Sequence, residues 1–303
     1  MSFTKDAKAE ILTHATEWEG ETILRAHLYG MACFSKYYDA NGLSLQTEIA
    51  ALAKHLQTVL SALGIEANVE KRTGGYECSV RQPSEVAKLL ACLRFNPKQA
   101  SLRLARENIE GDDAFVAFLT GCFLAGGLIT NPAKEYLMEF LTPRFNFAAD
   151  FTVLLFEKGF DPKRTVRKSQ HIIYFKASEQ VEDLLATMGA TAASFEVMNL
   201  KIIKDIRNNA NRVTNCEAAN IEKTITATKR YLECITYLEK GGVLQFLPME
   251  VQQVAVLRRE HPAITLAELG ALCNPPVGKS GVSYRLRKIE AAAAKLREKE
   301  QNG

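Results

Sequence analysis

The residues of this chain that are best suited to binding chemistry lie close together near its C-terminal end. A basic segment there carries cationic and hydroxyl side chains: Lys279, Ser280, Ser283, Tyr284, Arg285, Arg287 and Lys288. Such side chains donate hydrogen bonds to phosphate oxygens, and an arginine can pair with both acceptors on a guanine edge. The residue types in this segment therefore indicate nucleic-acid binding.

Histidines and cysteines give no comparable indication of catalysis or metal binding. The five histidines, at positions 14, 27, 55, 171 and 261, are far apart in the sequence and have no acid at catalytic spacing, so each is interpreted as structural. The seven cysteines are odd in number and include no CxxC pair, which argues against a zinc site and a disulfide framework. Reduced thiols suit the cytoplasm. We predict no catalytic residue, metal or cofactor.

Charge is distributed unevenly along the chain. Residues 1–198 hold 21 Lys and Arg against 24 Asp and Glu, whereas residues 199–303 hold 17 against 11. A basic tail on an acidic body indicates a polyanionic partner for the tail, although a solvated surface of this charge is also ordinary. No run of 18 apolar residues is present and the N-terminus lacks an apolar core, so we predict neither a membrane span nor a signal peptide.

The elements that must position the basic segment follow a helix-turn-helix pattern over about residues 265–297. Thr265 and Glu268 have the spacing of a capping box. The apolar positions of the first helix are Leu266, Leu269 and Leu272, and those of the second are Val282, Leu286, Ile289, Ala293 and Leu296. Residues 274–278 break the chain between them. In this motif the start of the second helix enters the major groove of double-stranded DNA. The alternative is a basic helix that closes a small bundle.

A helical linker is predicted before this motif, over residues 196–245. Its apolar stripe comprises Ile221, Ile225, Leu232, Ile235 and Leu238, and it ends at Gly241 and Gly242. A further helix lies between Pro248 and Pro262. Backbone contacts with DNA are possible for Arg207, Arg212 and Lys223, while Asn215 and Asn220 are alternatively interpreted as caps of the linker helix. The domain limits predicted on this basis are 1–195, 196–245 and 246–303.

The first two thirds of the chain contain an internal repeat. Helical and alternating patterns predict helices over 23–34, 49–63 and 83–93 and strands over 42–48, 65–71 and 76–81. The same order returns as helices from 115, 145–158 and 178–188 and strands over 135–141, around 165 and over 171–176. Identities recur at an offset of 95, as in Gly64 and Gly159, whereas Gly30 matches Gly121 at an offset of 91. The sequence therefore predicts an α+β fold duplicated as α-β-α-β-β-α over about 20–95 and 115–190, with four residues inserted near Asn131. An all-α domain follows it.

Two segments of this repeat resemble the LAGLIDADG helix of homing endonucleases. They are residues 119–127, LTGCFLAGG, and the weaker match at residues 28–36, LYGMACFSK. In that family the two helices pack closely on a pseudo-two-fold axis, and an acid at the end of each holds the catalytic metal. Ser35 and Gly126 stand at those positions here, and neither can supply an anionic oxygen ligand. The resemblance thus implies a nuclease fold without its metal site.

The complete chain resembles the WhiA family. Residues 211–224, NRVTNCEAANIEKT, and residues 278–289, GKSGVSYRLRKI, carry that resemblance together with the degenerate LAGLIDADG helices. One departure is Tyr284, which stands where histidine is common. The resemblance implies a DNA-binding protein of the nucleoid that acts in cell division and chromosome segregation. Relatives in sporulating bacteria are transcription regulators, and some dock a sigma factor.

Two alternatives to a non-enzymatic DNA-binding protein follow from the same residues. The first is a residual endonuclease that uses displaced acids, for which the candidates are Asp39, Asp112 and Asp113. The second is a docking module in the N-terminal domain for a sigma factor or another protein, which the acidic charge of that domain favours over DNA wrapping. The absence of acids at positions 35 and 126 argues against the nuclease.

Overall fold

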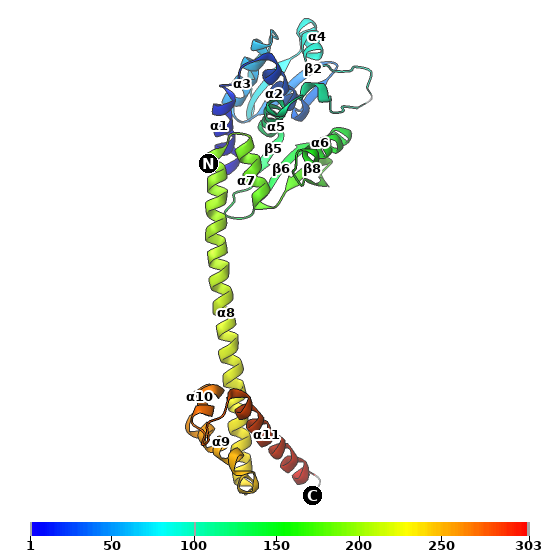
Figure 1. Ribbon diagram of the computed structural model, residues 1–303. Coiled ribbons are helices and arrows are strands. Elements are labelled where there is room, and N and C mark those ends of the chain that lie inside the picture. Colours follow the sequence, from blue (N-terminus) through cyan, green and yellow to red (C-terminus); the bar gives the residue numbers. More distant parts are fainter. Residues whose placement is uncertain (1, 100, 302–303) are drawn as a thin grey trace. The chain divides into compact units, whose positions relative to one another are not determined.

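The chain forms two compact units, one ending at Asp205 and the other beginning at Ile206. Figure 1 shows the computed structural model, which describes residues 2–99 and 101–301. Each unit has its own hydrophobic core, and the two cores share no residue. Among the described residues, none of the helices combines the length and apolarity required to cross a membrane.

The first unit combines helices with two antiparallel sheets, and its elements occur in two series. The first series is α1 (Phe3–Ala15), α2 (Glu21–Phe34), β1 (Tyr37–Asp39), β2 (Gly42–Thr47), α3 (Ala50–Ala62), β3 (Asn68–Arg72), β4 (Gly75–Val80) and α4 (Pro83–Cys92). A short 3-10 helix, η1 (Arg106–Asn108), lies in the connection. The second series is α5 (Asp112–Gly126), β5 (Gly127–Ile129), β6 (Met138–Thr142), α6 (Phe145–Glu157), β7 (Lys163–Arg167), β8 (Gln170–Phe175) and α7 (Ser178–Thr187).

Strand pairing confirms the duplication residue by residue. The sheets have the corresponding orders β1-β2-β4-β3 and β5-β6-β8-β7. Leu43 pairs with Val80 in the first sheet and Met138 with Phe175 in the second, so both members of the pair are displaced by 95 residues. The first hairpin pairs Tyr38 with Leu43, whereas the second pairs Ile129 with Met138. The second hairpin therefore has the longer loop, residues 130–137, where the insertion near Asn131 was expected.

Several predicted boundaries were wrong, and one α-helix and two strands of the first unit were missed. The missed elements are α1, β1 and β5. The strand predicted from Ile65 begins at Asn68, because the Ile65 amide donates to the Leu60 carbonyl at 2.9 Å and completes the end of α3. Gly64 takes the left-handed conformation this ending needs, with φ of 74°. The strand predicted from Glu135 begins at Met138, since the Glu135 amide bonds to the Asn131 carbonyl within the inserted loop.

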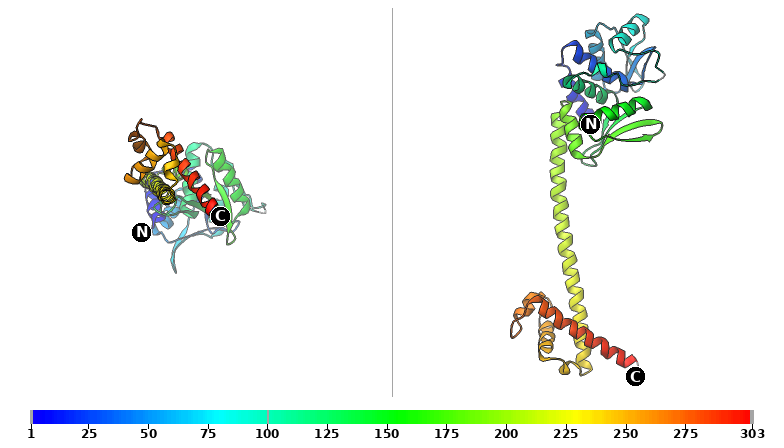
Figure 2. Two further views of the ribbon diagram at one scale, coloured as in Figure 1. Left: turned by 90° about the horizontal axis from the view of Figure 1, so that it is seen from below. Right: turned by 45° about the vertical axis from the view of Figure 1, so that its right-hand side comes forward.

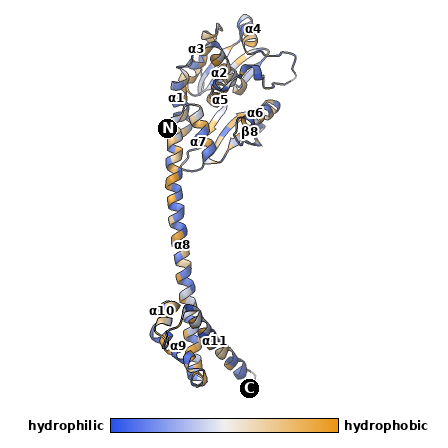
Figure 3. Ribbon diagram, viewed as in Figure 1, coloured by the Kyte–Doolittle hydropathy of each residue, from blue (hydrophilic) through white to orange (hydrophobic). Residues whose placement is uncertain are grey.

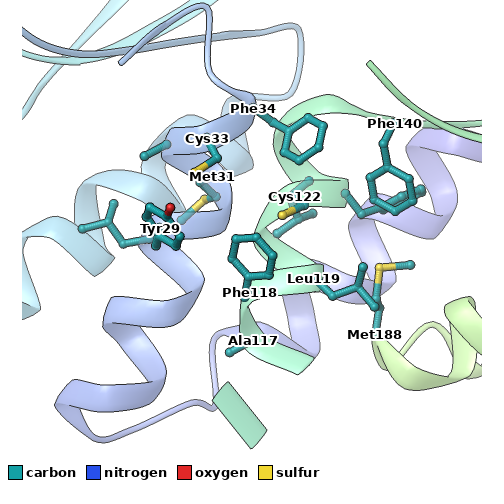
Figure 4. Packing of buried hydrophobic residues seen from close by; sticks show 14 of the residues in the cluster. Tyr29, Met31, Cys33, Phe34, Ala117, Phe118, Leu119, Cys122, Phe140 and Met188 are labelled. Carbon is teal, nitrogen blue, oxygen red and sulfur yellow. The ribbon is translucent and has the colours of Figure 1, made fainter. Parts of the chain in front are cut away.

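Helices α2 and α5 pack side by side at the centre of the first unit, as the LAGLIDADG resemblance predicts. A Cβ atom at Gly30 would overlap the Phe118 carbonyl oxygen, and one at Gly121 would overlap the His27 carbonyl oxygen. The two glycines thus allow a reciprocal close approach of the helix backbones. Figure 4 shows the buried side chains that extend this contact, among them Phe34 of α2 and Phe118 of α5.

The second unit consists of helices around the C-terminal turns of α8 (Thr191–Lys240). They are η2 (Leu244–Phe246), α9 (Met249–Glu260), α10 (Leu266–Ala271) and α11 (Lys279–Gln301). Ile235 and Leu238 of α8 are buried with Val254 of α9 and with Leu286 and Ile289 of α11. Figure 2 shows α9, α10 and α11 gathered around this end of α8. The unit is therefore a small helical bundle with one core.

Helix α8 covers most of the predicted linker but differs from it in its bounds and in the burial of its apolar stripe. It is continuous from Thr191, and the Glu10 carboxylate of α1 caps its start by accepting from the amides of Ala192 and Ala193 at 2.6 and 3.1 Å. Asn215 and Asn220 lie in the interior of the helix, so their interpretation as caps was wrong. The predicted apolar stripe is only partly covered, because Ile235 and Leu238 are buried while Ile221 and Ile225 are exposed.

Candidate nucleic-acid interface

The capping box at the start of α10 is present. The Thr265 hydroxyl accepts from the Glu268 amide at 3.3 Å, and the Glu268 carboxylate accepts from the Thr265 amide at 2.7 Å. The hydrogen bond from the Thr265 backbone holds the pKa of the Glu268 carboxyl below its usual value. This cap fixes where α10 begins and so sets the path of the turn that follows it.

The turn between α10 and α11 folds back on Gly270. The Val277 amide donates to the Gly270 carbonyl at 3.0 Å, and a Cβ atom at position 270 would overlap the Val277 carbonyl oxygen. Helix α10 ends at Ala271, and Leu272 follows it as the C-cap residue. The half-buried Leu266 packs against the core as predicted, whereas Leu272 is 49% exposed, which corrects the prediction that it faces the core. Cys273 is buried instead.

A buried arginine, which no local sequence pattern marks, supports the loop before α10. Arg258 of α9 is 1% exposed. Its Nη1 donates to the Ile264 carbonyl oxygen at 2.8 Å and lies 3.3 Å from the Pro262 carbonyl oxygen. Burial lowers the pKa of this guanidinium. In the sequence Arg258 stands next to the exposed Arg259 and looks like an ordinary surface cation.

Most of the predicted contact residues form one exposed face on the first three turns of α11. Lys279, Ser280, Tyr284, Arg287 and Lys288 are all exposed. The Lys288 ammonium lies 4.8 Å from the centre of the Tyr284 ring, within cation–π distance. Val282, Leu286 and Ile289 occupy the opposite, buried face. The helix thus presents hydroxyl, phenol and cationic groups together while its apolar stripe fixes its orientation.

Arg285 and Ser283 lie at the sides of this face. The Arg285 side chain is only 13% exposed, and its Nη2 lies 3.6 Å from a carboxylate oxygen of Glu250 in α9. Arg285 is therefore less exposed than Lys288, although both belong to the predicted contact segment. Ser283 is half-buried. Lys288 and Arg287 are therefore the better exposed cations on this part of α11.

The basic residues expected to contact DNA along α8 do not share one face. Arg207, Arg212 and Lys223 are all exposed. At about 100° per residue, Arg212 and Lys223 lie within about 20° of each other around the helix, whereas Arg207 lies about 140° from Arg212. A straight duplex could therefore contact Arg212 and Lys223 together, but not all three.

The positions of the missing nuclease acids are filled by packing. Ser35 is 1% exposed, and its hydroxyl donates to the Met31 carbonyl at 2.7 Å. A Cβ atom at Gly126 would lie 3.0 Å from the Leu141 carbonyl oxygen and 2.5 Å from the Phe34 ring. An acidic side chain at position 126 would require both neighbours to move. The described residues contain no cluster of three or more His, Cys, Asp or Glu side chains that could hold a metal.

Cations instead lie at the C-terminal ends of both central helices, with Lys8 buried and Arg144 half-buried. The Lys8 ammonium of α1 donates to the Leu124 carbonyl of α5 at 2.9 Å. The Arg144 guanidinium donates to the Cys33 and Ser35 carbonyls of α2 at 2.9 and 3.0 Å. Cys33 and Leu124 are equivalent in the repeat at the offset of 91. Each helix therefore ends on a positive charge, which stabilises the partial negative charge of its carbonyls and repels a divalent cation.

The alternative acids do not assemble a nuclease site. Asp112 and Asp113 lie in the first turn of α5, about 20 Å along the helix from Gly126. Asp112 forms an ion pair with Lys158 at 2.7 Å, and this contact holds the pKa of its carboxyl low. Asp39 accepts from the Asn41 amide at 2.8 Å within its own turn. No two of these three acids converge at the helix ends.

Two of the histidines that are far apart in the sequence, His27 and His55, meet in the first unit. The Nε2 atoms of His27 and His55 are 2.8 Å apart, and His27 Nδ1 lies 3.0 Å from the Ala117 carbonyl oxygen. His27 therefore donates from Nδ1 and accepts at Nε2 from the Nε2–H of His55. Burial, with the nearby charge of His55, lowers the pKa of His27 to about 3, and burial lowers the pKa of His55 to about 4. Both remain neutral, and no acid joins them.

Fold and site together define a protein with a degenerate LAGLIDADG-like domain followed by a helix-turn-helix domain. Family models give the same division. The WhiA LAGLIDADG-like domain matches residues 39–110 and 115–207, and the WhiA C-terminal HTH domain matches residues 210–293.

The chain belongs to the WhiA family. It is 34% identical over 315 residues to the "Probable cell division protein WhiA" of Thermoanaerobacter pseudethanolicus, covering 99% of each chain. Its identity to the protein of the same name from Clostridium acetobutylicum is 33% over 313 residues, covering 98% of this chain and 99% of the relative. The crystal structure of full-length DUF199/WhiA from Thermotoga maritima has the same fold, with a TM-score of 0.59 at 20% identity over 97% of this chain and 99% of that one.

Proposed function

We propose that this chain is a non-enzymatic DNA-binding protein that acts in cell division. In this proposal it associates with the nucleoid, regulates transcription and contributes to chromosome segregation. The observation that carries the proposal is the exposed face of α11, where Lys279, Ser280, Tyr284, Arg287 and Lys288 project from a helix placed by a capped α10 and a tight turn. The role in cell division is suggested by the names of relatives that match nearly the whole chain.

The residues of α11 divide by the part of DNA that each would contact. Lys288 and Lys279 are suited to phosphate, and the helix N-terminus adds a partial positive charge there. Arg287 is suited to a bidentate contact with guanine, and Ser280 or Tyr284 to a base edge or phosphate. Arg285 already faces Glu250, so we assign it a smaller share of the contact with DNA.

Fluorescence anisotropy of a labelled duplex at several salt concentrations tests the proposal on the full chain. Lys288→Ala should weaken binding to all sequences and lower the log-log salt slope by about one unit. Arg287→Ala should cost about 1–3 kcal/mol, with the larger loss on a preferred site. Arg285→Ala is the matched control and should change the slope less than Lys288→Ala. Equal affinity of all three variants and the unaltered protein would contradict the proposal.

The N-terminal unit is assigned no catalytic role in this proposal, against the endonuclease alternative. Lys8, which is buried, and Arg144, which is half-buried, support this assignment, because each brings a positive charge to a helix end that carries the metal-binding acid in a nuclease. Plasmid incubated with the protein and Mg²⁺ or Mn²⁺ should stay intact. Cleavage that is lost in Asp112→Asn or Asp113→Asn would overturn this part of the proposal.

A further inference from the structure

The second unit contains an apolar groove that lies away from the exposed face of α11. The groove runs along α8 between Asn220 and Lys240, and the loop between α9 and α10 and the last turns of α11 also line it. Its volume is about 1150 Å³. The twenty-residue span of α8 corresponds to about 30 Å of helix. Small-molecule sites typically enclose about 300–1,000 Å³, so a groove of this length and volume suits a peptide segment better.

The floor of the groove is an uncovered apolar helix face. Ile221, Ile225 and Leu232 follow one another at helical spacing, and Ile221 and Ile225 are 60% and 62% exposed. Pro262 and Ala263 extend the apolar surface from the α9–α10 loop. Figure 3 shows apolar segments recurring along α8. An exposed apolar face of this kind can bind an amphipathic helix, whose own apolar side chains recur at positions i, i+4 and i+7.

The charge on the rim of the groove indicates which kind of partner would bind there. Lys229, Lys240 and Arg297 line it with a single acid, Glu233, among the described residues. Neither Lys229 nor Lys240 forms an ion pair with any described residue, whereas Arg297 stacks over the Tyr237 ring at 5.0 Å. Residues 206–303 hold 15 Lys and Arg against 10 Asp and Glu, so two copies meeting at this rim would repel each other.

We propose that this groove binds an acidic amphipathic helix of a partner protein. Apolar side chains of the partner would cover Ile221, Ile225 and Leu232, and its acidic side chains would pair with Lys229, Lys240 and Arg297. The groove and the exposed face of α11 use different residues, so partner and DNA can bind together. This site does not depend on the assignment of α11 to DNA.

The probe for the test is a pair of labelled synthetic peptides of about 18 residues, long enough to span most of the groove. Both carry leucines at helical spacing, with glutamates on the polar face of one and lysines on that of the other. Anisotropy with the full chain should show that the acidic peptide binds at least about tenfold more tightly than the basic one. The double variant Lys229→Glu, Lys240→Glu should reverse that preference.

Matched aspartate substitutions on α8 locate the binding. Ile225→Asp should weaken binding of the acidic peptide about tenfold or more, because it places a charge in the apolar floor. Val213→Asp, at a residue of the same helix that is 57% exposed and outside the groove, should leave the affinity unchanged. Both positions are on the surface, so folding should be retained in both variants.

The same variants separate the proposed occupant from the other candidates. Duplex DNA should bind Ile225→Asp and the unaltered protein equally, and neither should self-associate in sedimentation velocity. Equal peptide binding by Ile225→Asp and Val213→Asp would overturn the proposal. So would a dimer that Ile225→Asp abolishes, since a second copy would then fill the groove. Loss of DNA binding in Ile225→Asp would overturn it in favour of a nucleic-acid contact.

Discussion

The distance from each glycine to neighbouring backbone atoms decides whether alanine can replace it. Gly270 and Gly281 lie on either side of the turn between α10 and α11, but a side chain at each meets different neighbours. At position 270 a Cβ atom overlaps the Val277 carbonyl oxygen, whereas at position 281 it meets the Val277 Cβ at 3.4 Å, an ordinary contact. Sequence alone does not distinguish the two.

Gly270→Ala should therefore destabilise the second unit by about 2 kcal/mol or more, since the turn must move to admit the methyl group. Gly281→Ala lies in the first turn of α11 and should leave stability unchanged or raise it by up to about 1 kcal/mol. Urea unfolding followed by far-UV circular dichroism measures both. Equal stabilities for the two variants would show that the turn adjusts freely and that Gly270 is not needed for it.

The paired histidines predict a pH dependence of stability with a defined sign. Their folded pKa values, about 3 for His27 and about 4 for His55, lie below the unfolded value of about 6.5. Between pH 6 and 5 the unfolded chain binds protons that the native chain does not. The free energy of unfolding of the first unit should therefore fall as the pH falls, by up to about 2.7 kcal/mol per pH unit for two protons.

The variant His55→Gln tests this dependence, because Gln keeps an N–H donor and removes one titrating group. Its slope between pH 6 and 5 should be smaller than that of the unaltered protein by about one proton, about 1.4 kcal/mol per pH unit. Trp18, the single tryptophan, packs against His27 with ring centres 5.0 Å apart and so reports on this unit by fluorescence. Identical slopes would mean that the pair is already protonated in the native protein.

Among the elements, the crossing of α2 and α5 determines the stability of the first unit. Gly121→Ala should destabilise that unit by about 3 kcal/mol or more, because the added methyl group meets the backbone of α2 and not a flexible side chain. Gly281→Ala serves again as the control, as a helical glycine whose added methyl has room. Unfolding followed by Trp18 fluorescence should show the loss in Gly121→Ala alone. A variant as stable as the control would mean that the helices can separate at little cost.

Because the molecule has two compact units, we expect one of them, the second, to bind DNA more strongly than the other. Arg72 and Arg81 of the first sheet and its flank both pair with Glu77, at 3.0 and 2.6 Å, whereas the exposed Lys71 of β3 forms no ion pair with described residues. The second sheet has two such cations, since Lys163 and Arg164 on its edge strand β7 are exposed and form no ion pair with described residues. That strand is the surface to examine if the first unit binds DNA.

A fragment of residues 206–303 should retain most of the DNA affinity of the whole chain and the same salt slope, whereas residues 2–205 should bind weakly. The boundary follows the compact units, because Val197 is fully buried in the first core and a fragment ending at 195 would remove it. Anisotropy of one labelled duplex against both fragments measures the division. Strong binding by residues 2–205 that is lost on changing Lys163 and Arg164 to Ala would move the DNA site to β7.

The sequence alone determined features that repeat or depend on near neighbours. The fixed offsets of 95 and 91 predicted a duplicated α+β fold and the place of its insertion, and the register confirms both. The spacing of Thr265 and Glu268 predicted the capping box, because both partners lie within one helical turn. The apolar period of α11 separated its buried from its exposed face, apart from the sides where Arg285 turns toward α9.

Tertiary structure alone decided which polar side chains are buried and what they contact. Lys8 reaches a carbonyl 116 residues away, and Arg144 reaches one 111 residues away, so no local pattern marks either. His27 meets His55 only after α2 and α3 pack, and Arg258 is buried beside the exposed Arg259. A lysine or arginine looks the same in the sequence whether its side chain is exposed to water or packed inside the protein. Its role follows from the desolvation and hydrogen bonds that packing of distant segments provides.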